Sequence, residues 1–228
     1  MFDGNLRKSV DQAVKPIGQS LQRAGVKPDH LTALGMIVSF VAAAVIANGW
    51  LNLGVLLLAV AALPDLLDGA VAKAAGTAST RGAFFDSTAD RVTDGVLLFG
   101  VAWYIKNAES PELALLPMAI LGVTSLISYQ RAKAESLGFD AKGGLMERAE
   151  RLLLLGFGLF FGALLVPVLW LLFVLSTITA IQRFVKIWKQ ASVDVPVVST
   201  SKQRRPRRAA RSARMERRRQ RVRRTPRR

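Results

Sequence analysis

The stretch DLLDGAVAKAAGTASTRGAFFDSTAD, residues 65–90, decides the architecture of this chain. It holds two pairs of aspartates, one spaced by three residues and one by four, so in helices each pair shares a face. The four are Asp65, Asp68, Asp86 and Asp90. Apolar runs flank them, and a carboxylate at the centre of a membrane helix costs roughly 2.5–3.5 kcal/mol. A cluster of oxygen ligands at this density favours Mg²⁺, Mn²⁺ or Ca²⁺. The alternative is a set of solvated carboxylates at helix ends.

The spacing of these residues follows a longer and more specific pattern than a simple cluster of acidic residues. It reads D-x2-D-G-x2-A-K-x8-G-x3-D-x3-D from Asp65 to Asp90. This resembles the signature of the CDP-alcohol phosphotransferase family, D-x2-D-G-x2-A-R-x8-G-x3-D-x3-D. Lys73 stands where the family has arginine, so a phosphate there would meet a point charge and not a bidentate fork.

Blocks of apolar residues predict six membrane-spanning helices, in an all-α integral membrane protein. Asp29 is expected to cap the first helix, Pro64 to kink the second, and Pro167 to mark the bend between the last two. The short NGWLN segment predicts a tight hairpin between the first two. The six-helix domain is expected over residues 29–189. The predicted spans are 31–48, 51–73, 83–105, 112–130, 147–165 and 167–185.

The two ends of the chain differ from this domain. Residues 5–24 alternate apolar and charged positions at helical spacing, which predicts an interfacial amphipathic helix within residues 1–28, with a soluble leader helix as the alternative. Residues 190–228 are expected to form a disordered, Arg-rich cytoplasmic tail. Within it, residues 202–228 supply +14 of the net charge of +16. Anionic lipids are the expected partner, at about 1 kcal/mol per basic residue. A nucleic-acid arm is less favoured, because no aromatic residues or folded reader accompany the tail.

Composition and charge narrow the function further. The chain has no cysteine and one histidine, which excludes disulfides, thiolate nucleophiles and paired catalytic histidines. Lys and Arg concentrate in four segments, so the positive-inside rule predicts that both termini are cytoplasmic. These segments are 1–28, 73–81, 131–151 and 183–228. The aspartate cluster would then face the cytoplasm, where a nucleotide can reach it.

A second chemical centre is expected in SYQRAKAESLGFDAKGGLMERAERLLLL, residues 128–155, joined by Arg183. The lysine and arginine side chains of this segment could together bind an anionic group. The alternative is positive-inside anchoring, which we prefer for Lys142, and Arg91 is expected only to balance nearby charge. The runs I-S-Y-Q-R-A-K-A-E at 127–135 and E-R-A-E-R-L at 147–152, together with D-R-V-T-D-G at 90–95, are similar to the phosphatidylinositol-phosphate synthases of actinobacteria within the family.

The resemblance implies transfer of a phosphatidyl group from CDP-diacylglycerol to inositol phosphate, with release of CMP. It implies Mg²⁺, with Mn²⁺ open and two ions expected, and a homodimer in the bacterial cell membrane. Asp90 would be the catalytic base and would also touch a metal held by Asp65, Asp68 and Asp86. The implied contacts to CDP-diacylglycerol are Asp29, His30, Leu31, Thr32, Gly69, Lys73 and Ser79. The candidates for the acceptor phosphate are Ser128, Arg131, Lys133, Arg151 and Arg183.

Two alternatives stay open at this point. Glycerol 3-phosphate would bring a phosphate to the same basic pocket, which would make the chain a phosphatidylglycerophosphate synthase. A cation transporter would also place carboxylates in a membrane. Transporters are expected to show repeat symmetry and carboxylates near the midplane, whereas here the carboxylates cluster at one end and no repeat is visible. The acceptor, the choice of metal and the role of the tail are not fixed by the sequence.

Overall fold

The computed structural model describes residue 20 and residues 28–75, 79–141 and 143–193, with side chains except at 28 and 64–75. All contacts below lie within residues 1–188, one of two compact units into which the chain divides. The described residues form helices and contain no strand, so the predicted all-α class is confirmed for them. The predicted amphipathic helix at 1–28 and the tail at 190–228 lie almost wholly outside the described residues.

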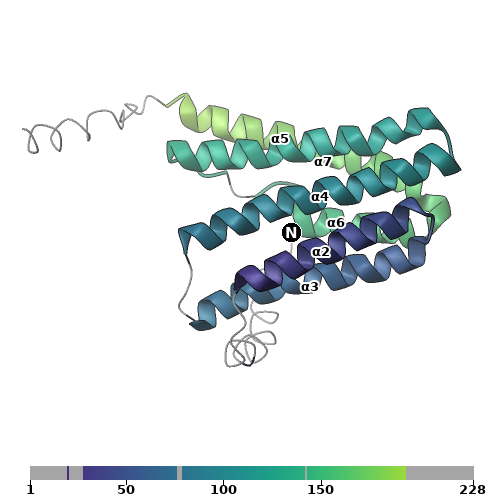
Figure 1. Cartoon of the computed structure of the whole chain (residues 1–228). Coiled ribbons are helices and arrows are strands. Elements are labelled where there is room, and N and C mark those ends of the chain that lie inside the picture. Colours follow the sequence, from purple (N-terminus) through teal and green to yellow (C-terminus); the bar gives the residue numbers. More distant parts are fainter. Residues whose placement is uncertain (1–19, 21–27, 76–78, 142, 194–228) are drawn as a thin grey trace, which may run out of the picture. The chain divides into compact units, whose positions relative to one another are not determined.

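The helices follow one another with short connections (Figure 1). The four predicted spans that come first begin within three residues of observed helices. In chain order the elements are α2 (Pro28–Ala47), α3 (Leu51–Ala75), α4 (Thr80–Ala108), η1 (Pro111–Ala114), α5 (Leu115–Leu137), α6 (Arg148–Phe160), η2 (Gly162–Leu164) and α7 (Leu165–Ala191).

Two predicted details of these helices are wrong. The bend between the last two helices lies at residues 161–164 and not at Pro167, which sits in the first turn of α7. A proline is tolerated there because the first amides of a helix have no intrahelical partner. Asp29 is not an N-cap, because α2 already begins at Pro28, a residue preferred at the first helical position. The backbone of α3 continues as one helix through Pro64, and its kink stays a prediction.

Three helices are long and apolar enough to cross a membrane: Asp29–Ala47, Pro111–Leu137 and Gly162–Ala191. Leu51–Leu63 is a shorter apolar segment within α3. With 29 residues, α4 is about 44 Å long, which exceeds a hydrocarbon core of about 30 Å. Its charged first turns can therefore lie outside hydrocarbon. The chain is a helical membrane protein, and the count of six spans remains a prediction.

The helices pack through close backbone approach and a continuous apolar core. α2 packs against α3 and α4, α4 against α5, and α3 against α6 (Figure 1). Gly49 closes the predicted tight hairpin between α2 and α3 with φ +84°, a conformation that favours glycine. A Cβ on Gly100 of α4 would stand 2.5 Å from the carbonyl oxygen of Ala43 on α2, so these helices meet backbone to backbone.

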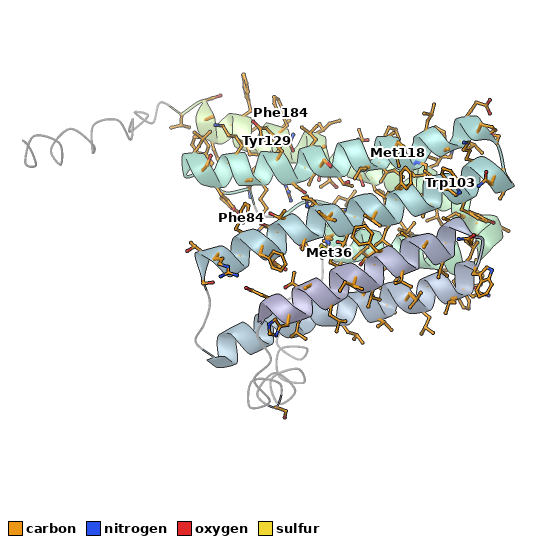
Figure 2. All side chains as sticks on the ribbon, viewed as in Figure 1. Met36, Phe84, Trp103, Met118, Tyr129 and Phe184 are labelled. Carbon is orange, nitrogen blue, oxygen red and sulfur yellow. The ribbon has the colours of Figure 1, made fainter. Side chains whose placement is uncertain are left out.

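Large apolar side chains also cover the outside of the helices. Phe84, Trp103 and Phe184 project away from the ribbon, as Figure 2 shows, and all three are exposed. Such a surface is costly in water and natural in lipid. Near the end of α4, the Lys106 ammonium lies 5.2 Å from the centre of the Trp103 ring, a pair suited to a membrane–water interface.

Candidate active site

A cavity of about 1310 Å³ lies between α3, α4, α5, α6 and α7. One wall is apolar and comes from α3 and α6, including Val55, Leu58 and Leu152. The polar lining comes from α4 to α7 and includes Asp86, Asp90, Arg91, Ser128, Arg131, Glu147, Arg148, Arg151 and Arg183. A cavity with one apolar wall and several charged groups suits a ligand that has both hydrocarbon and phosphate parts.

Asp86 and Asp90 lie one turn apart on α4 and both line this cavity. The side chains of Asp65 and Asp68 are outside the described residues, as are those of Gly69 and Lys73. Among the side chains that the structure does describe, no group of three or more potential metal ligands gathers. Asp86 and Asp90, two carboxylates one turn apart that face the same cavity, fit a hard divalent cation. The complete ligand set stays a prediction.

Asp90 is held by two arginines. Its Oδ1 atom lies 2.8 Å from Nη1 of Arg148 on α6, and its Oδ2 atom lies 3.8 Å from Nη2 of Arg91. Arg91 also donates a hydrogen bond to the hydroxyl of Ser128 on α5. Arg91 therefore balances charge, as expected, and also joins α4 to α5.

Arg148 and Arg151 occupy the first turn of α6 because of a capping box. Glu147 is the N-cap, and its side chain accepts a hydrogen bond from the amide of Glu150. The Glu150 carboxylate accepts the Glu147 amide at 2.5 Å. The helix dipole disfavours cations at a helix N-terminus, so both arginines need anions from elsewhere.

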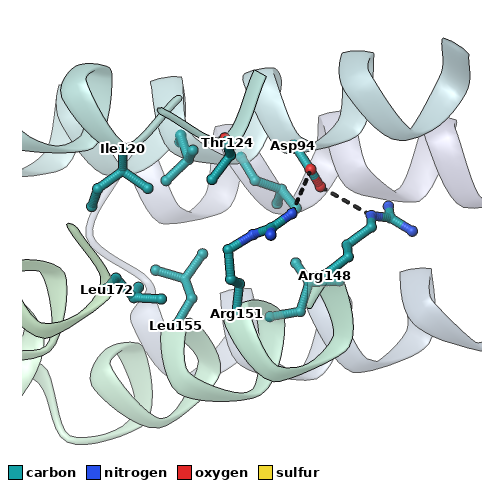
Figure 3. Close-up of a pocket in the computed structure, with 10 residues that line it drawn as sticks. Asp94, Ile120, Thr124, Arg148, Arg151, Leu155 and Leu172 are labelled. Carbon is teal, nitrogen blue, oxygen red and sulfur yellow. Dashed lines mark hydrogen bonds and ion pairs between the residues drawn. The ribbon is translucent and has the colours of Figure 1, made fainter. Parts of the chain in front are cut away.

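Asp94 of α4 supplies that charge (Figure 3). It is 8% exposed, and its Oδ1 atom accepts a hydrogen bond from Nε of Arg148 at 3.1 Å. Its Oδ2 atom lies 3.6 Å from Nη2 of Arg91 and 3.8 Å from Nη2 of Arg151. Nη2 of Arg148 also donates to the Thr93 hydroxyl at 3.0 Å. One buried carboxylate thus faces three guanidinium groups.

Four of the five predicted acceptor-side residues line the cavity: Ser128, Arg131, Arg151 and Arg183. Arg131 is exposed and pairs with Glu135 on the same helix at 2.9 Å. Lys133 is exposed and is not among the described residues of the cavity lining, so its predicted role has the weakest geometric support.

The Arg183 side chain is buried and donates hydrogen bonds to the backbone of two separate segments. Its Nη1 atom donates to the carbonyl of Ile127 at 3.1 Å and its Nη2 atom to that of Gly143 at 3.0 Å. One turn earlier, the Thr179 hydroxyl accepts the amide of Met146 at 3.2 Å. α7 therefore fixes the α5–α6 connection.

Of the residues predicted to contact CDP-diacylglycerol, those with described side chains lie at the N-termini of α2 and α4. Asp29, His30, Leu31 and Thr32 form the first turn of α2, and Asp29 lies 3.6 Å from Arg81 of α4. Ser79 caps α4, since its hydroxyl accepts the Gly82 amide at 3.0 Å. A Cβ on Gly82 would lie 3.2 Å from Oγ of Ser79 and 3.7 Å from Oδ1 of Asp29, so the N-termini of α2 and α4 adjoin.

The residues that sequence reasoning did not select are Thr93 and Asp94, together with Arg148 as their partner. A signal was present, because Asp94 continues the four-residue spacing of Asp86 and Asp90. Pairing Asp94 with Arg148 needed the structure, since 54 positions separate them.

Comparison with known proteins identifies the class. The sequence model of the CDP-alcohol phosphatidyltransferase family matches residues 26–188. The chain belongs to this family and is a transferase enzyme.

Within this family, the chain is similar to enzymes named as inositol phosphate lipid synthases. The phosphatidylinositol phosphate synthase of Mycobacteroides abscessus is 36% identical over 185 residues, covering 78% of this chain and 84% of that protein. The archaetidylinositol phosphate synthase of Methanothermobacter thermautotrophicus is 33% identical over 189 residues, covering 81% and 93%. The crystal structure of the Mycobacterium tuberculosis phosphatidylinositol phosphate synthase with CDP-DAG bound matches with a TM-score of 0.72 and 33% identity, covering 78% of this chain and 94% of that one. The same enzyme in complex with manganese and citrate matches with a TM-score of 0.72 and 34% identity, covering 77% and 88%.

Proposed function

We propose that this chain is a phosphatidylinositol phosphate synthase, which transfers a phosphatidyl group from CDP-diacylglycerol to inositol phosphate and releases CMP. The observation that carries this is the buried pair Arg151 and Arg183, which line the same cavity as Asp86 and Asp90. The names of the relatives and the CDP-DAG found in the mycobacterial structure support the same reading.

The reaction joins the acceptor hydroxyl to the phosphorus that carries diacylglycerol, and the bond from that phosphorus to the CMP oxygen breaks. Asp90 would accept the hydroxyl proton. Arg148, whose Nη1 atom lies 2.8 Å from Oδ1 of Asp90, would orient this carboxylate. Ser128, Arg151 and Arg183 would hold the acceptor phosphate, with Arg131 at the rim, so that the hydroxyl faces Asp90.

We also propose that the site binds a divalent metal. Asp65, Asp68, Asp86 and Asp90 would hold it, and we propose two Mg²⁺ ions, with Mn²⁺ as the substitute that the mycobacterial complex suggests. When bound, such ions neutralise the pyrophosphate and stabilise the charge on departing CMP. Asp29, His30, Leu31, Thr32, Gly69, Lys73 and Ser79 would contact CDP-diacylglycerol.

The proposed setting is the bacterial cell membrane, as a homodimer with six spans and both termini cytoplasmic. The distribution of Lys and Arg supports this orientation. Residues 1–28 would lie on the membrane surface and the tail on anionic lipids.

Of the two alternatives, family membership decides against the cation transporter. Glycerol 3-phosphate remains the rival acceptor, because it brings the same phosphate to the same arginines.

The test measures CMP release from CDP-diacylglycerol by the purified full chain in detergent with Mg²⁺. The acceptors compared are inositol phosphate, free inositol and glycerol 3-phosphate. We expect inositol phosphate to be used far better than free inositol, because charge-assisted bonds to arginine require the phosphate. Preference for glycerol 3-phosphate, or equal use of inositol and its phosphate, would contradict the proposal.

A further inference from the structure

We infer that Asp94 is a positioning residue, which acts through Arg148 to orient Asp90. This inference rests on the proposed function in that Asp90 is taken as the proton acceptor. Asp94 itself lines a small cavity of about 30 Å³. It is not among the described residues that line the large cavity, so it would act without touching substrate.

Each nitrogen of the Arg148 guanidinium has its own partner. Nε bonds Asp94 Oδ1 at 3.1 Å, Nη2 bonds the Thr93 hydroxyl at 3.0 Å, and Nη1 reaches Asp90 Oδ1 at 2.8 Å. A guanidinium is planar and rigid, so two of these contacts fix where the third donor points. Thr93 also donates to the backbone carbonyl of Asp90 at 3.1 Å. Thr93 and Asp94, which we call the bracket, therefore hold the Arg148 guanidinium in the orientation in which its Nη1 atom points at Asp90.

Stability alone does not account for this bracket. Apolar residues of similar volume often replace a buried ion pair without loss, and two arginines at a helix N-terminus oppose the helix dipole. Arg91, Arg148 and Arg151 converge on the two carboxylates Asp90 and Asp94. An ion-pair network that stability does not require, and that ends on the Asp90 carboxylate, is best explained by a role in the reaction.

The experiment compares steady-state kinetics of Asp94→Asn, Arg148→Lys and their double variant with the wild type. We expect Asp94→Asn to lower kcat roughly 10- to 100-fold, as loss of a supporting hydrogen-bond partner commonly does, with the KM for CDP-diacylglycerol unchanged. Because Asp94 acts through Arg148, adding Asp94→Asn to Arg148→Lys should reduce kcat little further.

Thr93 offers a matched pair that does not remove a buried charge. Thr93→Val keeps the shape and loses the hydroxyl, so kcat should fall, whereas Thr93→Ser keeps the acceptor for Arg148 and should recover most of it. Asp140→Asn is the control, since Asp140 pairs with Lys186 at 2.8 Å outside the cavity lining, and it should leave kcat unchanged. Thermal unfolding and CDP-diacylglycerol binding without acceptor are measured for every variant.

Wild-type kcat in Asp94→Asn, or in Thr93→Val if the first variant does not fold, would overturn the inference. So would fully multiplicative losses in the double variant, or a loss of kcat that follows loss of thermal stability. If the wild type does not use inositol phosphate, the proposed function fails on its own. The same variants are then compared with whichever acceptor alcohol drives CMP release, and the inference is judged by the same outcomes.

Discussion

At the scale of single residues, Arg183 serves two purposes that can be separated. It donates to the carbonyls of Ile127 and Gly143, and the same guanidinium lines the cavity proposed for the acceptor phosphate. A buried carbonyl that loses its donor costs about 1–3 kcal/mol, whereas a lost ligand contact appears in KM.

Arg183→Ala should therefore lower the free energy of unfolding by roughly 1–3 kcal/mol and raise the acceptor KM. The KM for CDP-diacylglycerol should stay near the wild-type value. Thermal unfolding in detergent and kinetics with each substrate varied in turn measure the two effects. Arg131→Ala is the stability control, because its exposed pair with Glu135 contributes only about 0.3–0.5 kcal/mol. A variant defective toward the nucleotide alone would contradict the proposed acceptor pocket.

The predicted metal site is tested by Asp86→Asn, which keeps the shape of the side chain and removes its charge. We expect the Mg²⁺ concentration for half-maximal turnover to rise roughly tenfold or more, equivalent to about 1.4 kcal/mol of binding. Asp65→Asn and Asp68→Asn should behave alike. A Mg²⁺ titration of turnover measures this, with chelator to remove bound metal first. Near wild-type turnover at ordinary Mg²⁺ would exclude that residue as a ligand.

Single residues also show what a sequence can predict about the site. Asp86 and Asp90 were selected because their spacing is local, and the structure places both at the cavity. The contacts of Arg148 depend on which face α6 turns toward α4, and no local spacing contains that information. Lys133, two positions after Arg131, shows the same limit, because neighbours two apart on a helix do not face the same way.

At the scale of elements, the crossing of α2 and α4 determines how closely the helix that carries Asp86, Asp90 and Asp94 can approach its neighbour. Gly100 leaves no room for a methyl group there. Elsewhere, Gly122 of α5 has no atom within 4 Å of the position where its Cβ would stand. The two glycines are thus a matched pair for testing the crossing.

Gly100→Ala should destabilise the fold by roughly 1–3 kcal/mol, because backbone atoms of Ala43 would have to move. Gly122→Ala should be neutral or stabilise by roughly 0.5–1 kcal/mol, since alanine is the better helix former. Thermal unfolding of both variants in the same detergent measures the difference. Equal stability of the two would show that α2 and α4 are not in backbone contact.

The elements themselves were predicted well where apolar runs are bounded by turn residues, as with Gly49 between α2 and α3. The prediction failed around Phe161 to Leu164, where the chain turns at Gly162 inside a long, mostly apolar run. Hydropathy carries no signal for a bend of that kind. The bend between the last two helices was predicted at Pro167 because proline often ends a helix. The first turn of a helix accepts proline, however, and Pro167 lies there.

At the scale of the whole molecule, the net charge and the chemistry belong to different parts of the chain. Residues 202–228 hold most of the surplus charge, while the family match ends at residue 188 and every proposed chemical group lies at or before Arg183. The positive charge of the chain as a whole therefore says little about the site.

Deleting residues 202–228 should leave turnover in detergent largely unchanged. CMP release by the truncated and full-length proteins, purified side by side and matched for thermal unfolding, measures this. A truncated protein that folds but does not turn over would show that the tail takes part in the reaction.

The two hydrogen bonds from Arg183 to the α5–α6 segment also fix an order of events during translation. The arginine is made 40 residues after Gly143 and 56 after Ile127, the two carbonyls to which it donates. Every helix up to α6, with all the signature aspartates, can therefore be complete while the α5–α6 connection still lacks its hydrogen bonds to Arg183. A premature stop codon before position 183 would leave such an unfinished chain in the membrane, a natural substrate for the proteases that remove incomplete proteins.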